Sequence, residues 1–382
     1  MADPNRTTDA PPATHDASVS IAHDYLLVMR GAERTFAAIA ELYADAPILT
    51  LLYDEKSTGG RFAGRSITTS ALQRLGIGQS GFRRLLPMYP IAASRMTAPE
   101  SDVLVSSSSA FAHGIHVRPG TVHVCYSHTP FRYAWYEQER AIRETPAPLR
   151  RALRAHLRKM RRWDLKASSA VDLYIANSVL TRERIRQFYG RDAPIVHPPV
   201  ETQRFSPREP GEHLLLVSEL VRHKRVHVAL EAARRTHTPI RIVGSGPEHK
   251  ALSASYPEAE FLGRASDEEL VELYGTARAV IVPSREEFGI TAVEAQAAGR
   301  PVIAADAGGA QETVINGETG ILVKLDDVDA FALAVQHLDD LDFHSERAVA
   351  NAERFSVSAF QRRLSAQVRE ILRSDAVPRS IR

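Results

Sequence analysis

Short apolar runs alternate with helical patterns along the whole chain. Val19–Ala22 has the composition of a strand, Gly31–Tyr43 follows it with helical spacing, and Ile48–Tyr53 is apolar again. Further runs of the same kind are Val103–Ser106, Val122–Tyr126 and Leu173–Ala176. Strands that alternate with helices form parallel sheets covered by helices, so the pattern predicts an α/β protein.

The alternation is interrupted near Pro198 and Pro199, because consecutive prolines break regular elements. Beyond them the helical candidates are Val226–Arg235, Asp267–Ala277 and Thr291–Ala298. The strand candidates are Leu214–Ser218, Ile240–Gly244, Glu260–Leu262, Ala279–Val282, Pro301–Ala304 and Gly320–Val323. Since 382 residues exceed the usual size of one hydrophobic core, we expect two doubly wound domains joined near residue 200, with a cleft between them.

The two ends of the chain differ from the rest. Residues 1–18 are rich in Asp, Pro, Thr and Ala and lack the apolar stretch of a signal peptide, so a disordered leader is expected. We predict an N-terminal domain over residues 19–198 and a C-terminal domain over 199–354. In residues 355–382 a helix over Phe355–Leu372 should pack back on the N-terminal domain, before a basic tail.

Composition excludes several classes of protein. The chain has 48 Lys and Arg against 46 Asp and Glu, which gives no reason to expect a nucleic-acid partner. Its single cysteine, Cys125, excludes an intrachain disulfide, lies in an apolar context that predicts a buried thiol, and fits a cytoplasmic setting. No apolar run reaches transmembrane length, so any membrane contact is expected to be peripheral, on the inner face of the cell membrane.

The segment from Val282 to Ala295 carries the strongest functional signal. A strand ends at Pro283, Gly289 permits a sharp turn, and a helix is predicted from about Ile290. The free amides of Ile290, Thr291 and Ala292, together with the positive end of the helix dipole, would suit a diphosphate.

Two glutamates flank this helix start. Glu294 lies one turn into the helix and Glu286 precedes it, and carboxylates accept hydrogen bonds from the hydroxyls of ribose and sugars. In the alternative interpretation, both are solvated surface charges. Their spacing of seven intervening residues, followed by Ala295–Val302, closely resembles the signature of family 4 glycosyltransferases, retaining enzymes of the GT-B fold. The resemblance implies a nucleotide-sugar donor, with Glu286 near the sugar and Glu294 on the ribose.

Further stretches resemble a subgroup of mannosyltransferases in polysaccharide and O-antigen assembly. They are Ala22–Leu26, Arg30–Arg34, Tyr126–Trp135, Ala176–Ser178 and Gly308–Val314. The resemblance implies transfer of a hexose, mannose from GDP-mannose, to a hydroxyl of a glycan or a lipid-linked acceptor, without a metal or another cofactor.

The same resemblance places a basic pair on the donor diphosphate, where fixed cations stabilise the leaving group. Lys224 matches the lysine of that pair. Glu219 occupies the usual arginine position, and Arg222 is a hypothetical substitute. In the alternative interpretation, Lys224 and Arg222 are solvated surface charges.

The family also has glycine-rich turns near the donor. Gly31 corresponds to the first glycine of a frequent pair, although Ala32 replaces the second. Gly244 and Leu262 lie in loops that the family places beside the nucleotide. A plain turn is the alternative at each position.

Three residues of the N-terminal half complete the predicted site. The resemblance brings His128 to the donor sugar, and His23 and Asp24 follow the first strand, where acceptor binding is plausible. The alternative for each is a structural role.

A basic helix with interspersed leucines is predicted over Arg150–Arg162, and Phe82–Tyr89 has a similar character. Such a helix suits an anionic membrane surface, or it is a solvated helix whose apolar side lies in the core.

Because no enzymic nucleophile is evident, a same-face substitution is the working mechanism. The rival functions are a sugar-nucleotide epimerase, a nucleotide-sugar-binding protein without transferase activity and, on fold analogy alone, an NAD-dependent oxidoreductase.

Overall fold

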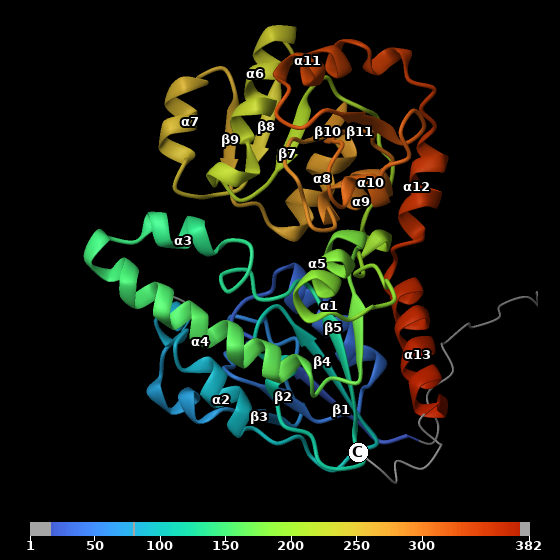
Figure 1. Cartoon of the computed structure of the whole chain (residues 1–382). Helices are drawn as coiled ribbons and strands as arrows, with labels where there is room; N and C mark the ends of the chain where they lie inside the picture. The colour runs from blue at the N-terminus through green and yellow to red at the C-terminus, as the bar shows by residue number, and fades with distance from the viewer. Residues whose placement is uncertain (1–16, 79–80, 375–382) are drawn as a thin grey trace, which may run out of the picture. The chain divides into compact units, whose positions relative to one another are not determined.

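The computed structural model describes residues 17–78 and 81–374, which fall into two compact units (Figure 1). Unit 1 contains the described parts of Met1–Asn177, Thr181–Val196 and Phe360–Arg382. Unit 2 contains Ser178–Leu180 and His197–Ala359. The predicted leader falls almost entirely outside the described residues.

Unit 1 is built on a parallel sheet of six strands. Across the sheet they are β3 (Ile67–Thr69), β2 (Ile48–Thr50), β1 (Val19–His23), β4 (Val103–Ser108), β5 (Val122–Ser127) and β6 (Leu173–Ala176). The strand β3 was not predicted, because this edge strand has three residues, two of them threonines, and lacks an apolar run. Cys125 is buried in β5, as predicted, and burial raises the pKa of its thiol to about 12.

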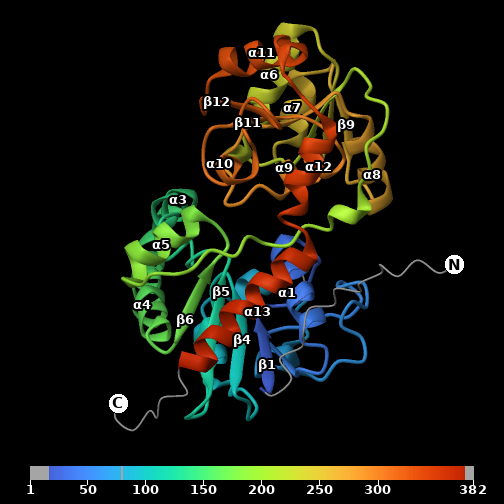
Figure 2. The ribbon, with the colours of Figure 1, turned by 90° about the vertical axis from the view of Figure 1, so that its right-hand side faces the viewer.

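Helices surround this sheet. They are α1 (Gly31–Leu42), α2 (Tyr89–Arg95), α3 (Gln138–Glu144), α4 (Arg150–Ser168), α5 (Val179–Tyr189) and the last helix α13 (Val357–Ser374). From Phe360 onward α13 belongs to unit 1, where it runs beside α1 (Figure 2). The side chain of Gln361 donates a hydrogen bond to the Ala38 carbonyl at 3.0 Å, and the Phe360 ring meets Tyr126 edge-on at 5.5 Å.

Unit 2 repeats the architecture. Its six parallel strands are, across the sheet, β12 (Gly320–Val323), β11 (Val302–Ala305), β10 (Ala279–Val282), β7 (Leu214–Val217), β8 (Ile240–Val243) and β9 (Glu260–Gly263). Its helices are α6 (Val226–Thr236), α7 (His249–Ser255), α8 (Asp267–Thr276), α9 (Ile290–Ala297), α10 (Ala310–Thr313), α11 (Val328–Gln336) and α12 (Ser345–Glu353).

Both faces of the unit 2 sheet are covered. Successive strand residues point to opposite faces, so Ile281 packs in one apolar cluster while Val280 and Val282 pack in the other. The first cluster includes residues of α6 and α11, and the second includes residues of α9 and α12. This arrangement confirms the prediction of doubly wound α/β sheets. Within the described residues no helix is long and apolar enough to cross a membrane.

Candidate functional site

The loop between β10 and α9 has the predicted form. Gly289 precedes α9 with a φ of 89°, in the left-handed region where a side chain is disfavoured, and the helix begins at Ile290. The prediction of a free Ala292 amide is wrong, because this amide donates to the Gly289 carbonyl at 3.0 Å. The amides of Ile290 and Thr291 have no hydrogen-bond partner among the described residues, so the start of α9 offers two free donors.

Glu286 and Lys224, which are far apart in sequence, form a close ion pair in unit 2. The Lys224 ammonium lies 2.8 Å and 2.6 Å from the two carboxylate oxygens of Glu286. The Ser284 hydroxyl donates to one of those oxygens at 2.5 Å. Both charged side chains remain about one fifth exposed, at 23% and 21%, so a ligand can reach the pair.

The loop that carries Glu286 is fixed by the segment after β11. The Gly309 amide donates to the Glu286 carbonyl at 2.9 Å, and Glu286 and Gly308 form a parallel bridge. The sequence motif Gly308–Val314 therefore has a structural role next to the candidate site, because it supports the backbone of Glu286.

Glu294 is oriented by a tyrosine that the sequence analysis did not single out. The Tyr274 hydroxyl, on α8, donates to the Glu294 carboxylate at 2.7 Å. Tyr274 is fully buried, and burial raises its pKa well above the usual range, so the hydroxyl stays protonated as a donor. A tyrosine on the buried side of an amphipathic helix needs a polar partner. The sequence could therefore have predicted that Tyr274 has a polar partner, but it does not show that this partner is Glu294.

The other predicted donor residues of unit 2 are more dispersed. Arg222 is exposed and makes no side-chain contact to a charged group among the described residues, while Glu219 is exposed in the preceding loop. Leu262 is 38% exposed on β9. Gly244 has a φ of 143°, and a Cβ there would lie 1.7 Å from the Ser218 carbonyl oxygen. Close packing of two loops therefore explains this glycine without a ligand.

His23 and His128 lie together in unit 1, at the carboxyl ends of β1 and β5. The Ser107 hydroxyl is 3.1 Å from His23 Nδ1 and 2.8 Å from His128 Nε2. Burial lowers the pKa of His23 to about 4 and that of His128 to about 3. Both rings are therefore neutral near pH 7 and act through hydrogen bonds rather than as fixed cations.

Asp24 has a structural function in the same unit. Its carboxylate accepts hydrogen bonds from the amides of Ser109, Phe111 and Ala112 at 2.7, 2.8 and 2.6 Å, and from the Ser108 hydroxyl at 3.1 Å. These four bonds hold the loop after β4. The acceptor-binding role of His23 and Asp24 stays a prediction.

Gly31 is the first residue of α1, and its carbonyl accepts from the Thr35 hydroxyl.

The basic segment Arg150–Arg162 is helical as predicted, within α4. Leu157 and Met160 are only 4% and 3% exposed, because the apolar side of α4 packs into unit 1. The structure thus matches the interpretation in which the apolar side lies in the core. The side that faces solvent carries arginines, including Arg151 and Arg154.

Part of the chain matches a known family. Residues 200–355, which lie within unit 2 and include Lys224, Glu286 and Glu294, match the model of the family described as "Glycosyl transferases group 1". Among curated proteins, glycogen synthase of Mycobacterium tuberculosis is 37% identical over 167 residues, 39% of each chain.

Two further relatives have similar coverage. D-inositol 3-phosphate glycosyltransferase of Acidothermus cellulolyticus is 34% identical over 49% of this chain and 50% of its own length. D-rhamnosyltransferase WbpZ of Pseudomonas aeruginosa is 34% identical over 36% of this chain and 39% of its own. The chain thus spans between about two fifths and one half of the length of these curated relatives.

Solved structures share the fold over nearly the whole chain. HepE of Anabaena, in complex with UDP-glucose, superposes with a TM-score of 0.69 at 19% identity, over 92% of this chain and 100% of HepE. Sucrose-phosphate synthase of Thermosynechococcus elongatus gives a TM-score of 0.70 at 17% identity, over 94% and 100% of the two chains. These likenesses confirm the predicted two-domain GT-B fold.

Proposed function

We propose that the chain transfers a hexose from a nucleotide-diphosphate sugar to an acceptor hydroxyl, with retention of the anomeric configuration. The observation that carries the proposal is the Lys224–Glu286 pair, which supplies a partly exposed cation and a carboxylate in the same unit as the free amides of α9. The match of residues 200–355 to glycosyl transferases group 1 covers all of these groups and supports the same reaction class.

Each group has a distinct task in this reaction. Lys224 and the α9 amides stabilise the negative charge that develops on the leaving diphosphate. Glu286 orients the sugar through its hydroxyls, and Glu294 binds the ribose. Because Lys224 is paired with Glu286 before the donor binds, the diphosphate competes with Glu286 for the ammonium group. His128 is a further candidate for orienting the sugar.

The transfer proceeds by same-face substitution, with Lys224 rather than a metal ion as the cation at the diphosphate. Arg222 is the second cation of the proposed site, since it is exposed near Lys224 in the same short 3₁₀ helix.

The specific donor and acceptor belong to the proposal as well. We propose GDP-mannose as donor and a glycan or lipid-linked acceptor, from the motifs shared with mannosyltransferases. Contact with an anionic membrane surface would be electrostatic, through the exposed arginines of α4. The relatives include a rhamnosyltransferase and a glycogen synthase, so the donor test needs a wide range of sugars.

The direct experiment is a transfer assay with GDP-mannose and a panel of other UDP- and GDP-hexoses, with membrane-extracted lipids and glycans as acceptors. The wild type should form a glycosylated product, and Glu286→Ala should abolish it. Unchanged turnover of Glu286→Ala with every accepted donor would remove Glu286 from the mechanism. Conversion of the donor without an acceptor would indicate an epimerase, and tight donor binding without transfer would indicate a binding protein.

Replacing Tyr274 by phenylalanine should raise the KM for the donor about tenfold with little change in kcat. The substitution removes one hydrogen bond to a charged group, the Glu294 carboxylate, and leaves the buried ring in place. Steady-state kinetics of the variant measure the effect. A donor whose ribose lacks its hydroxyls is the control, because it should bind the variant and the wild type equally. An identical tenfold loss with that donor would show that Tyr274 does not act through Glu294.

A further inference from the structure

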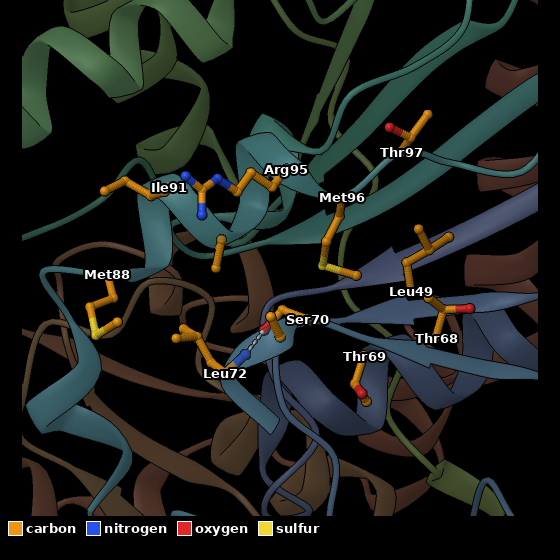
Figure 3. A pocket seen from close by; sticks show the side chains of 12 residues that line it. Leu49, Thr68, Thr69, Ser70, Leu72, Met88, Ile91, Arg95, Met96 and Thr97 are labelled. Carbon is orange, nitrogen blue, oxygen red and sulfur yellow. Dashed lines mark hydrogen bonds between the residues drawn. The ribbon is translucent and has the colours of Figure 1, made fainter. Parts of the chain in front are cut away.

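A cavity of about 470 Å³ lies in unit 1, between the edge strand β3, its neighbour β2 and helix α2 (Figure 3). None of the residues predicted for the donor or acceptor lines it. Its apolar lining consists mainly of Leu49, Leu72, Met88, Ile91, Ala92 and Met96. The volume falls in the range of small-molecule sites, which is about 300–1,000 Å³.

The lining has a buried floor and an exposed edge. Leu49, Leu72 and Met96 are between 1% and 8% exposed, whereas Met88 is 45% and Ile91 is 57% exposed. Large apolar side chains at the edge of an apolar cavity extend the surface that a hydrocarbon would cover. The cavity therefore favours a ligand with an alkyl chain.

The polar groups of the lining offer little to a sugar. The Ser70 hydroxyl already donates to the Leu51 carbonyl at 2.7 Å and accepts from the Leu72 amide at 3.2 Å (Figure 3). The other polar side chains of the lining are three threonines and one arginine. A ligand rich in hydroxyls would bury many of its own hydroxyl groups without hydrogen-bond partners, and this is costly in an apolar cavity.

The arginine gives the cavity a cationic edge. Arg95 is exposed on α2, where Figure 3 shows its side chain beside Ile91, and it has no hydrogen bond or ion pair with another described residue. Arg95 is the one charged side chain among the residues that line the cavity. An acidic head group would therefore be attracted to this edge.

Helix α4 extends the positive charge next to the cavity wall. The Trp163 indole on α4 donates to the Ser94 hydroxyl on α2 at 2.8 Å, so the two helices are in contact. The solvent side of α4 carries Arg151, Arg154 and Arg158. A helix with a basic solvent side therefore packs against the helix that carries Arg95.

We propose that this cavity binds the hydrocarbon chain of an anionic amphiphile whose acidic head pairs with Arg95. The site is separate from the donor-binding groups of unit 2. The proposal does not depend on the transfer reaction, because binding is measured without a donor or an acceptor.

The test is calorimetric titration of the full chain with decyl phosphate at concentrations below its micelle formation. Decyl maltoside has the same chain with a neutral head, and inorganic phosphate has the head alone. We expect decyl phosphate to bind at least tenfold more tightly than decyl maltoside, and inorganic phosphate not to bind. Since this comparison uses the wild type only, it does not depend on the folding of any variant.

Two surface variants locate the site. Arg95→Gln should weaken binding of decyl phosphate about tenfold and leave decyl maltoside unchanged, whereas Ile91→Glu should weaken both. The matched controls are Lys250→Gln, an exposed lysine on α7, and Leu333→Glu, a 54% exposed leucine on α11. The proposal would be overturned if Arg95→Gln and Ile91→Glu bound decyl phosphate as tightly as the wild type. It would also be overturned if the wild type bound decyl maltoside, or inorganic phosphate, as tightly as decyl phosphate.

Discussion

Replacing Lys224 by alanine should lower kcat/KM for sugar transfer about 100- to 1,000-fold, while the stability of unit 2 changes little. Removal of one preorganised group that stabilises developing charge typically costs about 2.7–4 kcal/mol of transition-state stabilisation. The effect on folding should be small, because a partly exposed ion pair contributes about 0–1 kcal/mol. Transfer assays and thermal unfolding of the same preparation measure both quantities.

The control variants separate the charge from the packing of Lys224. Lys224→Arg keeps the positive charge and should recover part of the activity, although the guanidinium differs in shape from the ammonium. Lys250→Ala removes an exposed lysine elsewhere in unit 2 and should leave transfer unchanged. A loss of less than fivefold in Lys224→Ala would show that Lys224 does not stabilise the leaving diphosphate. Another cation, with Arg222 as the first candidate, would then have to do so.

The order of the main elements was predictable because their sequence signals are local. The apolar run Ala279–Val282 is β10 with the same bounds, and Gly289 correctly marked the start of α9. A strand between turns and a glycine before a helix depend on neighbours in the chain, which the sequence displays directly. The edge strand β3 was missed because its three residues are held by pairing with β2 rather than by an apolar pattern of their own.

The side-chain partners were less predictable, because they come from distant parts of the sequence. Glu286 and Lys224 were predicted to contact the same donor molecule. Their direct pairing, however, depends on how the loops after β7 and β10 approach each other. Tyr274 meets Glu294 from a different helix, and Asp24 binds amides of a loop more than 80 residues away. A hydrophobic pattern specifies which side of an element is buried, but not which polar group it meets there.

Asp164 provides the clearest case of such a partner in unit 1. It lies on α4 with a fully buried carboxylate, although the sequence around it is basic. One carboxylate oxygen accepts from the Trp135 indole at 2.7 Å and from the Tyr189 hydroxyl at 2.9 Å. His113 Nε2 lies 3.1 Å from the other oxygen, as a close electrostatic contact rather than a well-aligned hydrogen bond. The carboxylate therefore joins α4 to the loop before α3 and to α5.

Replacing Asp164 by alanine should lower the free energy of unfolding of unit 1 by about 2–6 kcal/mol, because each of two buried donors that loses its acceptor costs about 1–3 kcal/mol. The loss arises because the indole and hydroxyl donors stay buried without acceptors. Urea unfolding followed by tryptophan fluorescence measures unit 1 alone, since both tryptophans of the chain, Trp135 and Trp163, lie in it.

The size of the loss in two further variants tests this explanation. Asp164→Asn keeps one acceptor oxygen at the same position, so it should lose less than the alanine variant, about 1–3 kcal/mol. Asp192→Ala removes an exposed aspartate of unit 1 that pairs with Arg186, and it should cost less than about 1 kcal/mol. If Asp164→Ala were no more destabilising than Asp192→Ala, the buried carboxylate would not hold α4 in place. The orientation of the basic helix would then have to come from its other contacts, such as the packing of Leu157 and Met160 and the Trp163–Ser94 hydrogen bond.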